Sequence, residues 1–335
     1  MKLELKNIKK SFEGKEILHG INFSVESGRA LGLLGRNGAG KTTTIRIIMD
    51  VFRANEGEIL LDGKKFKPDG SQVGYLPEER GLYPKKTVKE QMVYLAMLRG
   101  MNRKEANKST EKWLEKLQVS EYTQRKLETL SKGNQQKVQL AATLVAEPDI
   151  VILDEPFSGL DPVNSQILKD VISELISMGK IVIFSSHQMS YVEEFCEDIV
   201  IINKGEVVLS GNLDEIKSQY GKGRKIVSAY NYTLEELKDI CNEKLNEIVS
   251  VLFTNKHYVI LDMKENVNQW QVLEKLKELN VDVKAFGAYE PSLNDIFVSK
   301  VGEEAENAKE PKEDKEETNN KINKKKKGGK RSEKL

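Results

Sequence analysis

The chain has 335 residues, of which 39% are hydrophobic, and its formal net charge is +1. This length and composition predict packed cores, in one large domain with a smaller one or in two domains of similar size. The near-zero charge excludes a global electrostatic attraction to nucleic acid or anionic lipid. The N-terminus has no apolar h-region, and no window reaches about 18 uninterrupted apolar residues. We therefore expect neither a signal peptide nor a membrane span, and any membrane role would depend on a partner.

The first part of the chain, residues 1–220, alternates between strand and helix patterns. Segments 2–12 and 16–26 alternate apolar and polar residues, as half-buried strands do. A short buried strand at 29–35 ends in glycine, and a helical pattern over 40–52 follows it directly. Segment 87–119 predicts two helices separated by Gly100, which we interpret as a helical insertion.

The pattern then returns to strand, helix and strand. Segments 149–156 and 180–187 are strongly apolar and predict buried strands, with a helix over 162–179 between them. This order predicts an α/β fold with a largely parallel sheet.

Residues 222–300 have a different character and predict a small accessory domain. Short strand patterns and two amphipathic helix patterns follow one another in βαββαβ order. Trp270 falls at helical spacing with Leu273 and Leu276, so we expect it in the core of this domain. Cys196 and Cys241 lie far apart without metal-ligand spacing, which favours reduced structural thiols.

The C-terminal segment 301–335 is almost purely polar, with an acidic part followed by a basic part. Such a composition cannot bury enough apolar area to offset the entropy of ordering, so we expect a disordered charged tail. Its basic end could contact anionic lipid or RNA, although a solvated tail is the simpler interpretation.

The stretch GRNGAGKT at 35–42 matches the phosphate-binding pattern G-x-x-x-x-G-K-[ST], between a strand and a helix. Glycines let the backbone turn its N–H groups toward phosphate, and the helix N-terminus adds positive potential. Lys41 would reach the β and γ phosphates, and the Thr42 hydroxyl would ligate Mg²⁺. The residues expected to bind nucleotide here are Gly35, Arg36, Asn37, Gly38, Ala39, Gly40, Lys41, Thr42 and Thr43.

The second half of the same site is expected after the apolar run at 150–153. Asp154 and Glu155 follow this run at the carboxyl end of a strand, where ligands gather in open α/β sheets. Asp154 would hold Mg²⁺, and Glu155 would polarise the attacking water as a general base. The two motifs together predict an ATPase that uses ATP and Mg²⁺.

In this order the motifs resemble those of the nucleotide-binding subunits of ABC transporters. By this resemblance, Phe12 would stack on adenine, and His187 is the switch histidine that contacts the γ-phosphate. Asp161, at the end of SGLD, matches the D-loop. The stretch LSKGN at 130–134 occupies the place of the family's signature loop LSGGQ. The implied fold is a P-loop NTPase of ABC type, with a parallel core sheet, an antiparallel β subdomain and a helical insertion.

The resemblance also implies what the signature loop does. Ser131, Gly133 and Asn134 would face ATP that is held by a second copy of the chain, so that ATP joins two subunits and hydrolysis releases them.

Three positions depart from the family's pattern. Lys132 replaces a glycine and Asn134 a glutamine of the signature loop, and Glu78 stands where a glutamine usually meets Mg²⁺ and the attacking water. A carboxylate at position 78 could still ligate Mg²⁺, but its charge would alter turnover. Whether Lys132 contacts phosphate or points to solvent stays open.

The function implied is that of an ATP-driven transporter subunit. Two copies would drive export through a separate integral membrane permease, at the cytoplasmic face of the membrane. The segment GYLPEERGLYP, together with LSKGNQQKVQ, is similar to bacterial sodium-extrusion and related efflux ATPases, which also commonly end in a motif like EPSLNDIFV at 290–298. The transported solute is not encoded in this chain.

Two alternatives remain at this stage. One is a soluble ATPase that acts on ribosomes or nucleic acid, which only the basic tail favours. The other is a regulatory or sensing ATPase that is paired with a membrane protein.

Overall fold

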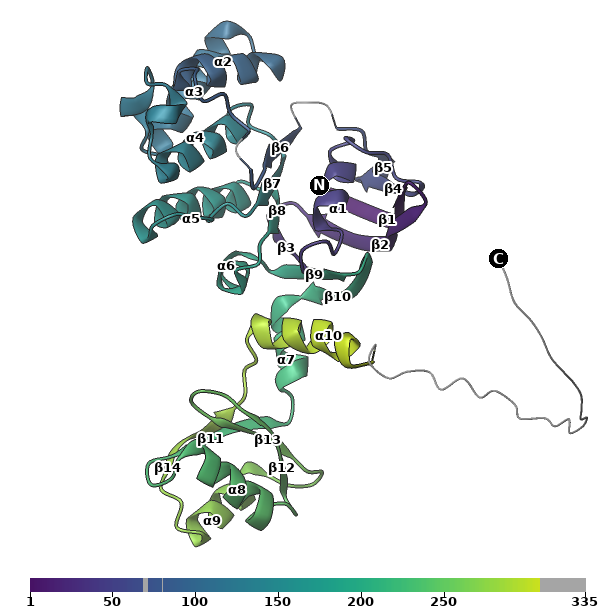
Figure 1. Cartoon of the computed structure of the whole chain (residues 1–335), viewed down its shortest axis with the longest axis vertical. Coiled ribbons are helices and arrows are strands. Elements are labelled where there is room, and N and C mark those ends of the chain that lie inside the picture. Colours follow the sequence, from purple (N-terminus) through teal and green to yellow (C-terminus); the bar gives the residue numbers. More distant parts are fainter. Residues whose placement is uncertain (69–71, 80, 308–335) are drawn as a thin grey trace, which may run out of the picture.

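The computed structural model describes residues 1–68, 72–79 and 81–307, with side chains to Val301. A six-stranded sheet in the order β10-β9-β3-β8-β7-β6 forms its centre (Figure 1). Neighbouring strands from β9 to β6 are parallel, and β10 is antiparallel to β9. The strands are β3 (Ala30–Leu34), β6 (Val73–Leu76), β7 (Ile150–Asp154), β8 (Ile181–Ser185), β9 (Asp198–Asn203) and β10 (Glu206–Asn212). The carboxyl ends of β3, β7 and β8 therefore meet at one edge.

The two faces of this sheet pack against different helices. On β7, Ile150 and Ile152 belong to the core that contains α1 (Lys41–Ile48), whereas Val151 and Leu153 belong to the core beneath α4, α5 and α6. Alternation along the strand explains this division, since successive side chains point to opposite faces. The second set of helices is α4 (Lys132–Leu144), α5 (Pro162–Ser177) and α6 (Met189–Phe195).

An antiparallel sheet and a helical insertion flank this centre. The sheet has the order β2-β1-β4-β5 and shares the core of α1. In the insertion, capping boxes at Thr87 and Asn102 begin α2 and α3, and Gly100 with φ +93° lies between the two helices. The bounds are β1 (Lys2–Phe12), β2 (Lys15–Glu26), β4 (Glu56–Leu61), β5 (Lys64–Lys65), α2 (Val88–Leu98), α3 (Arg103–Lys116) and 3₁₀ turns at Ser120–Tyr122 and Leu127–Thr129. The helix expected over 40–52 is shorter, because α1 ends at Ile48.

After α7 (Leu213–Gly221), the chain forms a four-stranded antiparallel sheet with the order β12-β13-β11-β14. The elements follow as β11 (Arg224–Ala229), α8 (Leu234–Lys244), β12 (Val249–Thr254), β13 (Val259–Met263), α9 (Gln269–Glu278) and β14 (Val283–Ala288). This part has a hydrophobic core of its own, which contains the fully buried residues Val227, Leu237 and Leu276.

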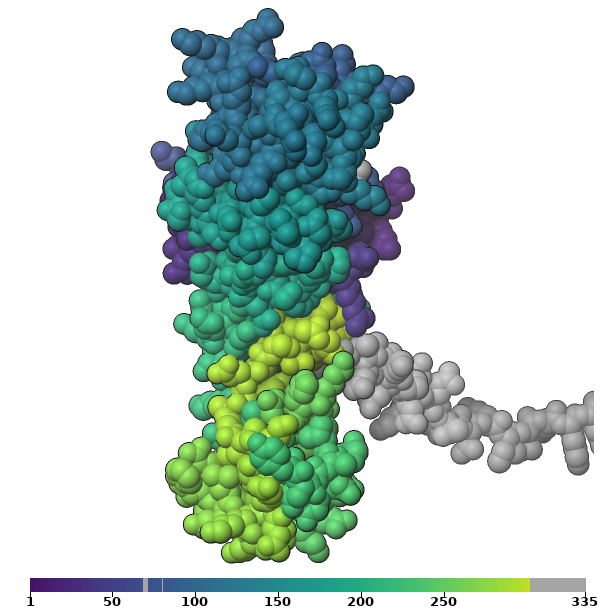
Figure 2. Space-filling model, turned by 90° about the vertical axis from the view of Figure 1, so that its left-hand side faces the viewer, coloured from purple at the N-terminus to yellow at the C-terminus, as the bar shows by residue number. Residues whose placement is uncertain are grey.

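The last helix, α10 (Leu293–Asn307), returns to the part of the molecule that contains the six-stranded sheet. In Figure 2 it forms the yellow band between the green accessory part and the teal part above it. Leu293, Ile296 and Val301 are buried in the core that includes α6 and α7. The Leu293 amide donates to Glu193 Oε1 at 2.9 Å, so α10 is tied directly to α6.

Two expectations about this C-terminal half were wrong. Trp270 is 65% exposed, because α9 turns Val272 and Leu276 to the core; of the predicted stripe, Leu276 is buried and Leu273 is half-buried. The predicted start of the tail at 301 falls inside α10, since a segment rich in Glu and Ala can continue a helix despite its polarity. The rest of the predicted tail, 308–335, lies outside the described residues.

No helix within the described part of the chain combines the length and apolar character that crossing a membrane requires. Cys196 and Cys241 are both buried free thiols, and burial raises the pKa of the Cys241 thiol to about 12. Such thiols are structural and unreactive, as the sequence predicted.

Candidate functional site

The phosphate loop connects β3 to α1 at the edge where the parallel strands end. Gly40 occupies the N-cap of α1 with φ +115°, and a Cβ there would lie 2.5 Å from Leu18 Cδ2. No side chain caps this helix, so its first amides are left to bind an anion. Gly35, Ala39 and Gly40 are buried, whereas Arg36, Asn37 and Gly38 are exposed. The loop thus offers a backbone cradle that fits a phosphate chain.

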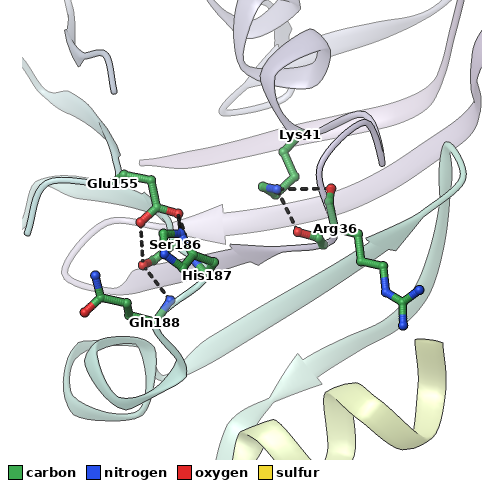
Figure 3. A network of polar contacts seen from close by, with 7 residues as sticks. Arg36, Lys41, Glu155, Ser186, His187 and Gln188 are labelled. Atoms are coloured by element: carbon green, nitrogen blue, oxygen red, sulfur yellow. Dashed lines mark hydrogen bonds and ion pairs between the residues drawn. The ribbon is translucent and has the colours of Figure 1, made fainter. Parts of the chain in front are cut away.

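Lys41 places a cation at this cradle (Figure 3). Its Nζ donates to the carbonyl oxygens of Gly35 at 2.7 Å and Arg36 at 3.4 Å. Burial lowers the pKa of Lys41, and the charges of Asp154, Glu155 and Glu78 oppose this effect. The ammonium group therefore lies in the field of the three carboxylates that the sequence assigned to catalysis and metal binding.

Asp154 ends β7 and is only 7% exposed. The Tyr75 hydroxyl donates to its Oδ2 at 3.3 Å. Burial raises the pKa of Asp154, and this hydrogen bond acts in the opposite direction. Burial, together with the charge of Asp154, raises the pKa of Tyr75 to about 12, so the phenol is a protonated donor at neutral pH.

Glu155 lies at the centre of a hydrogen-bond network at the ends of β7 and β8 (Figure 3). Its carboxylate accepts from Ser186 Oγ at 3.0 Å and from the His187 amide at 2.7 Å, and it contacts His187 Nδ1 at 2.7 Å. Ser186 Oγ also accepts from the Gln188 amide. Glu155 is 7% exposed and has φ +51°, a conformation that costs about 1–2 kcal/mol and is held here by these contacts.

The His187 ring is much more open than the carboxylate it contacts, because its side chain is 69% exposed. Nδ1 faces Glu155, which leaves the other ring nitrogen directed away from this contact. The ring can therefore hold the catalytic carboxylate on one side and meet an anionic group on the other.

The residues assigned to Mg²⁺ are consistent with a metal shared between protein and nucleotide. Thr42 is exposed at the first turn of α1, Asp154 ends β7, which is separated from β3 by β8, and the exposed Glu78 acts with Asp154 on the charge of Lys41. Across the described ranges, no group of three or more His, Cys, Asp or Glu side chains forms a metal cage. Mg²⁺ typically takes one or two protein oxygens together with substrate phosphates and water, which this donor set allows.

The signature loop lies elsewhere, at the start of α4. Ser131 is the N-cap of α4 and accepts from the Asn134 amide at 3.3 Å. Gly133 packs against α5: a Cβ at this position would lie 2.9 Å from Asn164 Nδ2, and Asp161 caps α5 through Asn164. The signature loop and the D-loop therefore form one exposed surface, separate from the phosphate loop.

Phe12 ends β1 and keeps 37% of its surface exposed. Its ring meets the Phe52 ring edge-on, with 5.2 Å between centroids, and Lys10 Nζ lies 4.9 Å from its centroid. An accessible aromatic ring backed in this way can stack on a base.

Comparison with known proteins decides the family. The chain is 39% identical over 311 residues to the uncharacterized ABC transporter ATP-binding protein YhaQ of Bacillus subtilis, an alignment that covers 90% of this chain and 98% of that protein. The chain belongs to the ABC transporter ATP-binding proteins. The ABC transporter family model matches residues 18–158, and a model of the C-terminal domain of DrrA1-3-like ATP-binding proteins matches 211–301.

Two further ABC ATP-binding proteins of B. subtilis are similar to this chain. The chain is similar to the linearmycin resistance ATP-binding protein LnrL, with 29% identity over 90% of this chain and 98% of LnrL. It is also similar to NatA, with 36% identity over 58% of this chain and 82% of NatA. A solved structure titled "Structure of ATP binding subunit of ABC transporter" covers 72% of this chain and 100% of its own, with 29% identity and a TM-score of 0.61.

These findings confirm the ABC-type P-loop fold and make the chain an ATP-binding ATPase, since ABC ATP-binding cassettes hydrolyse ATP. Subunits of this family generally pair with membrane permease components. The sequence motifs marked neither Tyr75 nor Ser186, which the structure places against Asp154 and Glu155. Ser186 directly precedes His187 in the chain, and Tyr75 directly precedes the LPE segment, but nothing in either position alone signals these contacts.

Proposed function

We propose that two copies of this ABC ATPase bind two ATP molecules between them and drive export of a solute through a separate membrane permease. Each ATP would be held by the phosphate loop of one copy and the signature loop of the other. In this arrangement Ser131 and the first amides of α4 contact the γ-phosphate across the interface.

The observation that carries this proposal is the separation of the two loops within one chain. Lys41 begins a helix on one face of the six-stranded sheet, and Ser131 begins a helix on the other face. Ser131 and Lys132 are exposed, as is Asp161 beside them. An exposed helix N-terminus that lies on the opposite face of the sheet from the phosphate loop of the same chain supports a site completed by a second copy.

Within each site the residues have separate tasks. Lys41 neutralises phosphate charge, and Glu155 accepts a proton from the attacking water as a general base. His187 orients Glu155 and offers its exposed side to the γ-phosphate. Mg²⁺, held by Thr42 and Asp154 with the phosphates, and with Glu78 nearby, would neutralise charge that develops on the phosphate oxygens. Phe12 would stack on adenine.

A groove between β6 and the helical insertion supports a permease contact. It has a volume of about 420 Å³ and is lined by Tyr75, Leu82, Leu95, Arg99 and Gln139 among others. On the neighbouring α2, Tyr94, Met97 and Leu98 are exposed by 53%, 46% and 63%. Several exposed apolar side chains close together on one helix are typical of a surface that binds another protein. We assign this surface to the permease, which would hold the ATPase at the cytoplasmic face of the membrane.

The direction of transport rests on relatives. LnrL is named for resistance to linearmycin, and the 211–301 segment matches a domain of DrrA1-3-like proteins. The resistance named for LnrL supports export, in agreement with the efflux branch that the sequence suggested.

We divide the chain into an ATP-binding domain at 1–220, an accessory domain at 222–300 and a charged tail from 301. The separate hydrophobic core of β11 to β14, α8 and α9 supports the first boundary. The helix α10 continues to Asn307 and packs with α6 and α7 in the core of the ATP-binding domain, so the tail in this division begins only after α10.

ATP-dependent dimerisation tests the proposal. The Glu155→Gln variant, mixed with ATP and Mg²⁺, should double its mass in size-exclusion chromatography with light scattering. Adding Ser131→Arg should abolish the dimer, whereas Ser177→Arg, on an exposed serine at the end of α5 opposite Asp161, should leave it intact. Glu155→Gln that stays monomeric at saturating ATP would contradict the two-copy site.

The transport assignment needs a separate test in membranes. Affinity purification of the tagged chain from detergent-solubilised cells should recover a multi-span membrane protein, and Met97→Glu with Leu98→Glu should reduce that recovery. Recovery of ribosomes or nucleic acid in place of a membrane protein would favour the soluble alternative.

A further inference from the structure

The hydrogen bond between Tyr75 and Asp154 follows from the way β6 and β7 pair. The strands are parallel, and Tyr75 lies opposite Ile152, two residues before Asp154. Residues two apart on a strand share a face, so Tyr75, Ile152 and Asp154 project to the same side of the sheet. The rise over two residues is about 7 Å, which the length of a tyrosine side chain spans. The Tyr75 hydroxyl therefore reaches Asp154 Oδ2.

The rest of Tyr75 is held in place on its other side. Its ring lines the groove between β6 and the helical insertion, together with Met49 and Gln139. Its backbone carbonyl accepts from Thr143 Oγ1 at 3.3 Å. One side chain thus forms part of the groove wall and also contacts the carboxylate assigned to Mg²⁺.

The chemistry of this contact suits a metal ligand. A carboxylate that binds Mg²⁺ must keep its orientation, and partners outside the coordination sphere supply that restraint. A neutral hydroxyl restrains the carboxylate and leaves its negative charge available to the cation. A cationic partner such as lysine would compete with the metal.

We propose that Tyr75 is a positioning residue that fixes the Asp154 carboxylate for Mg²⁺ through its hydroxyl group. This inference rests on the assignment of Asp154 to Mg²⁺ in the proposed function. It also means that any segment seated in the groove contacts the side chain that orients this ligand.

The Mg²⁺ dependence of nucleotide binding tests the proposal. The variant Tyr75→Phe keeps the ring in the groove wall and removes only the hydroxyl. Binding of a fluorescent ATP analogue would be titrated with Mg²⁺, and in parallel measured in EDTA. We expect Tyr75→Phe to raise the Mg²⁺ concentration at half-saturation about tenfold. Loss of a partner that orients a metal ligand weakens metal binding about 10–100-fold, and we expect the smaller effect because the 3.3 Å contact is long. Binding in EDTA should be unchanged.

Two controls separate positioning from general damage. Tyr230→Phe removes the hydroxyl of a tyrosine that is 71% exposed in the accessory part, and it should titrate as the parent does. In an Asp154→Asn background, the effect of Tyr75→Phe on the Mg²⁺ titration should disappear, because the hydroxyl then has no metal ligand to orient.

Three results would overturn the inference in different ways. If the parent depends on Mg²⁺ and Tyr75→Phe gives the same titration, the role of Tyr75 is wrong and the Mg²⁺ assignment stands. If neither the parent nor Asp154→Asn responds to Mg²⁺, the metal assignment fails and the role of Tyr75 fails with it. An equal loss of binding in EDTA and in Mg²⁺ would show a purely structural effect, which also refutes positioning.

Discussion

Replacing Glu155 by glutamine or by alanine should separate its chemical role from its structural one. The carboxylate accepts hydrogen bonds from Ser186 Oγ and the His187 amide and is 7% exposed. Glutamine keeps the size and one acceptor oxygen, and its amide group can donate to the Ser186 hydroxyl. Alanine removes every acceptor and leaves the His187 N–H and the Ser186 O–H without an acceptor, although Ser186 Oγ still accepts from the Gln188 amide.

The two variants should therefore differ in stability but agree in activity. An unpaired buried donor costs about 1–3 kcal/mol, so Glu155→Ala should unfold at lower urea concentration than the parent, while Glu155→Gln should stay within about 1 kcal/mol of it. Loss of the general base should lower single-turnover phosphate release by about 10²–10⁴-fold in both variants. ATP binding should persist in Glu155→Gln.

Phosphate release and urea unfolding would be measured on the same preparations. Hydrolysis by Glu155→Gln at the parent rate would refute the general-base role. Equal stability of the two variants would show that the network around Glu155 contributes nothing to the folded state.

Three further experiments test other parts of the account. Ile296→Ala, at a position 1% exposed on α10, should destabilise the protein by about 3 kcal/mol in urea unfolding, whereas Val298→Ala, at a position 56% exposed, should have little effect. Leu276→Ala should cost a similar amount, and Trp270→Ala should leave the unfolding midpoint unchanged; a destabilisation by Trp270→Ala as large as that by Leu276→Ala would support the predicted stripe, which contains both residues. Phe12→Ala should weaken ATP binding about tenfold through lost base stacking, without affecting inorganic triphosphate, and equal losses for both ligands would refute the stacking role.

The sequence predicted most of the nucleotide site because its parts are local. The phosphate loop and the Asp154–Glu155 pair each lie within one short segment, between a buried strand and the next element. His187 could be added because the resemblance supplied its role. The structure brings it to Glu155 because β7 and β8 are parallel neighbours.

Contacts that depend on strand register could not be predicted in this way. The Tyr75–Asp154 hydrogen bond joins residues 79 positions apart, and it requires that Tyr75 pair with Ile152. A shift of one residue would turn the tyrosine to the other face of the sheet. The sequence predicts the strands, but not which residues of β6 and β7 lie opposite each other.

Helical spacing misled the prediction for Trp270 for a related reason. Two stripes of apolar residues on α9 both include Leu276: the predicted one runs through Trp270 and Leu273, and the other runs through Val272. Packing against the sheet selects the second stripe, and Trp270 stays outside at the first turn of the helix. The helix could be predicted, but the face that it buries could not.

The central claim is that each ATP site is built from two copies, and mixing two inactive variants tests it most directly. Lys41→Ala removes the phosphate-loop cation and Ser131→Arg blocks the signature loop, so either variant alone should hydrolyse no ATP. A mixed dimer contains one intact site, formed by the Lys41 of one copy and the Ser131 of the other. An equimolar mixture should therefore recover up to about a quarter of the parent ATPase rate, because half of the dimers are mixed. A mixture as inactive as its components, or Ser131→Arg alone with the parent rate, would contradict the account.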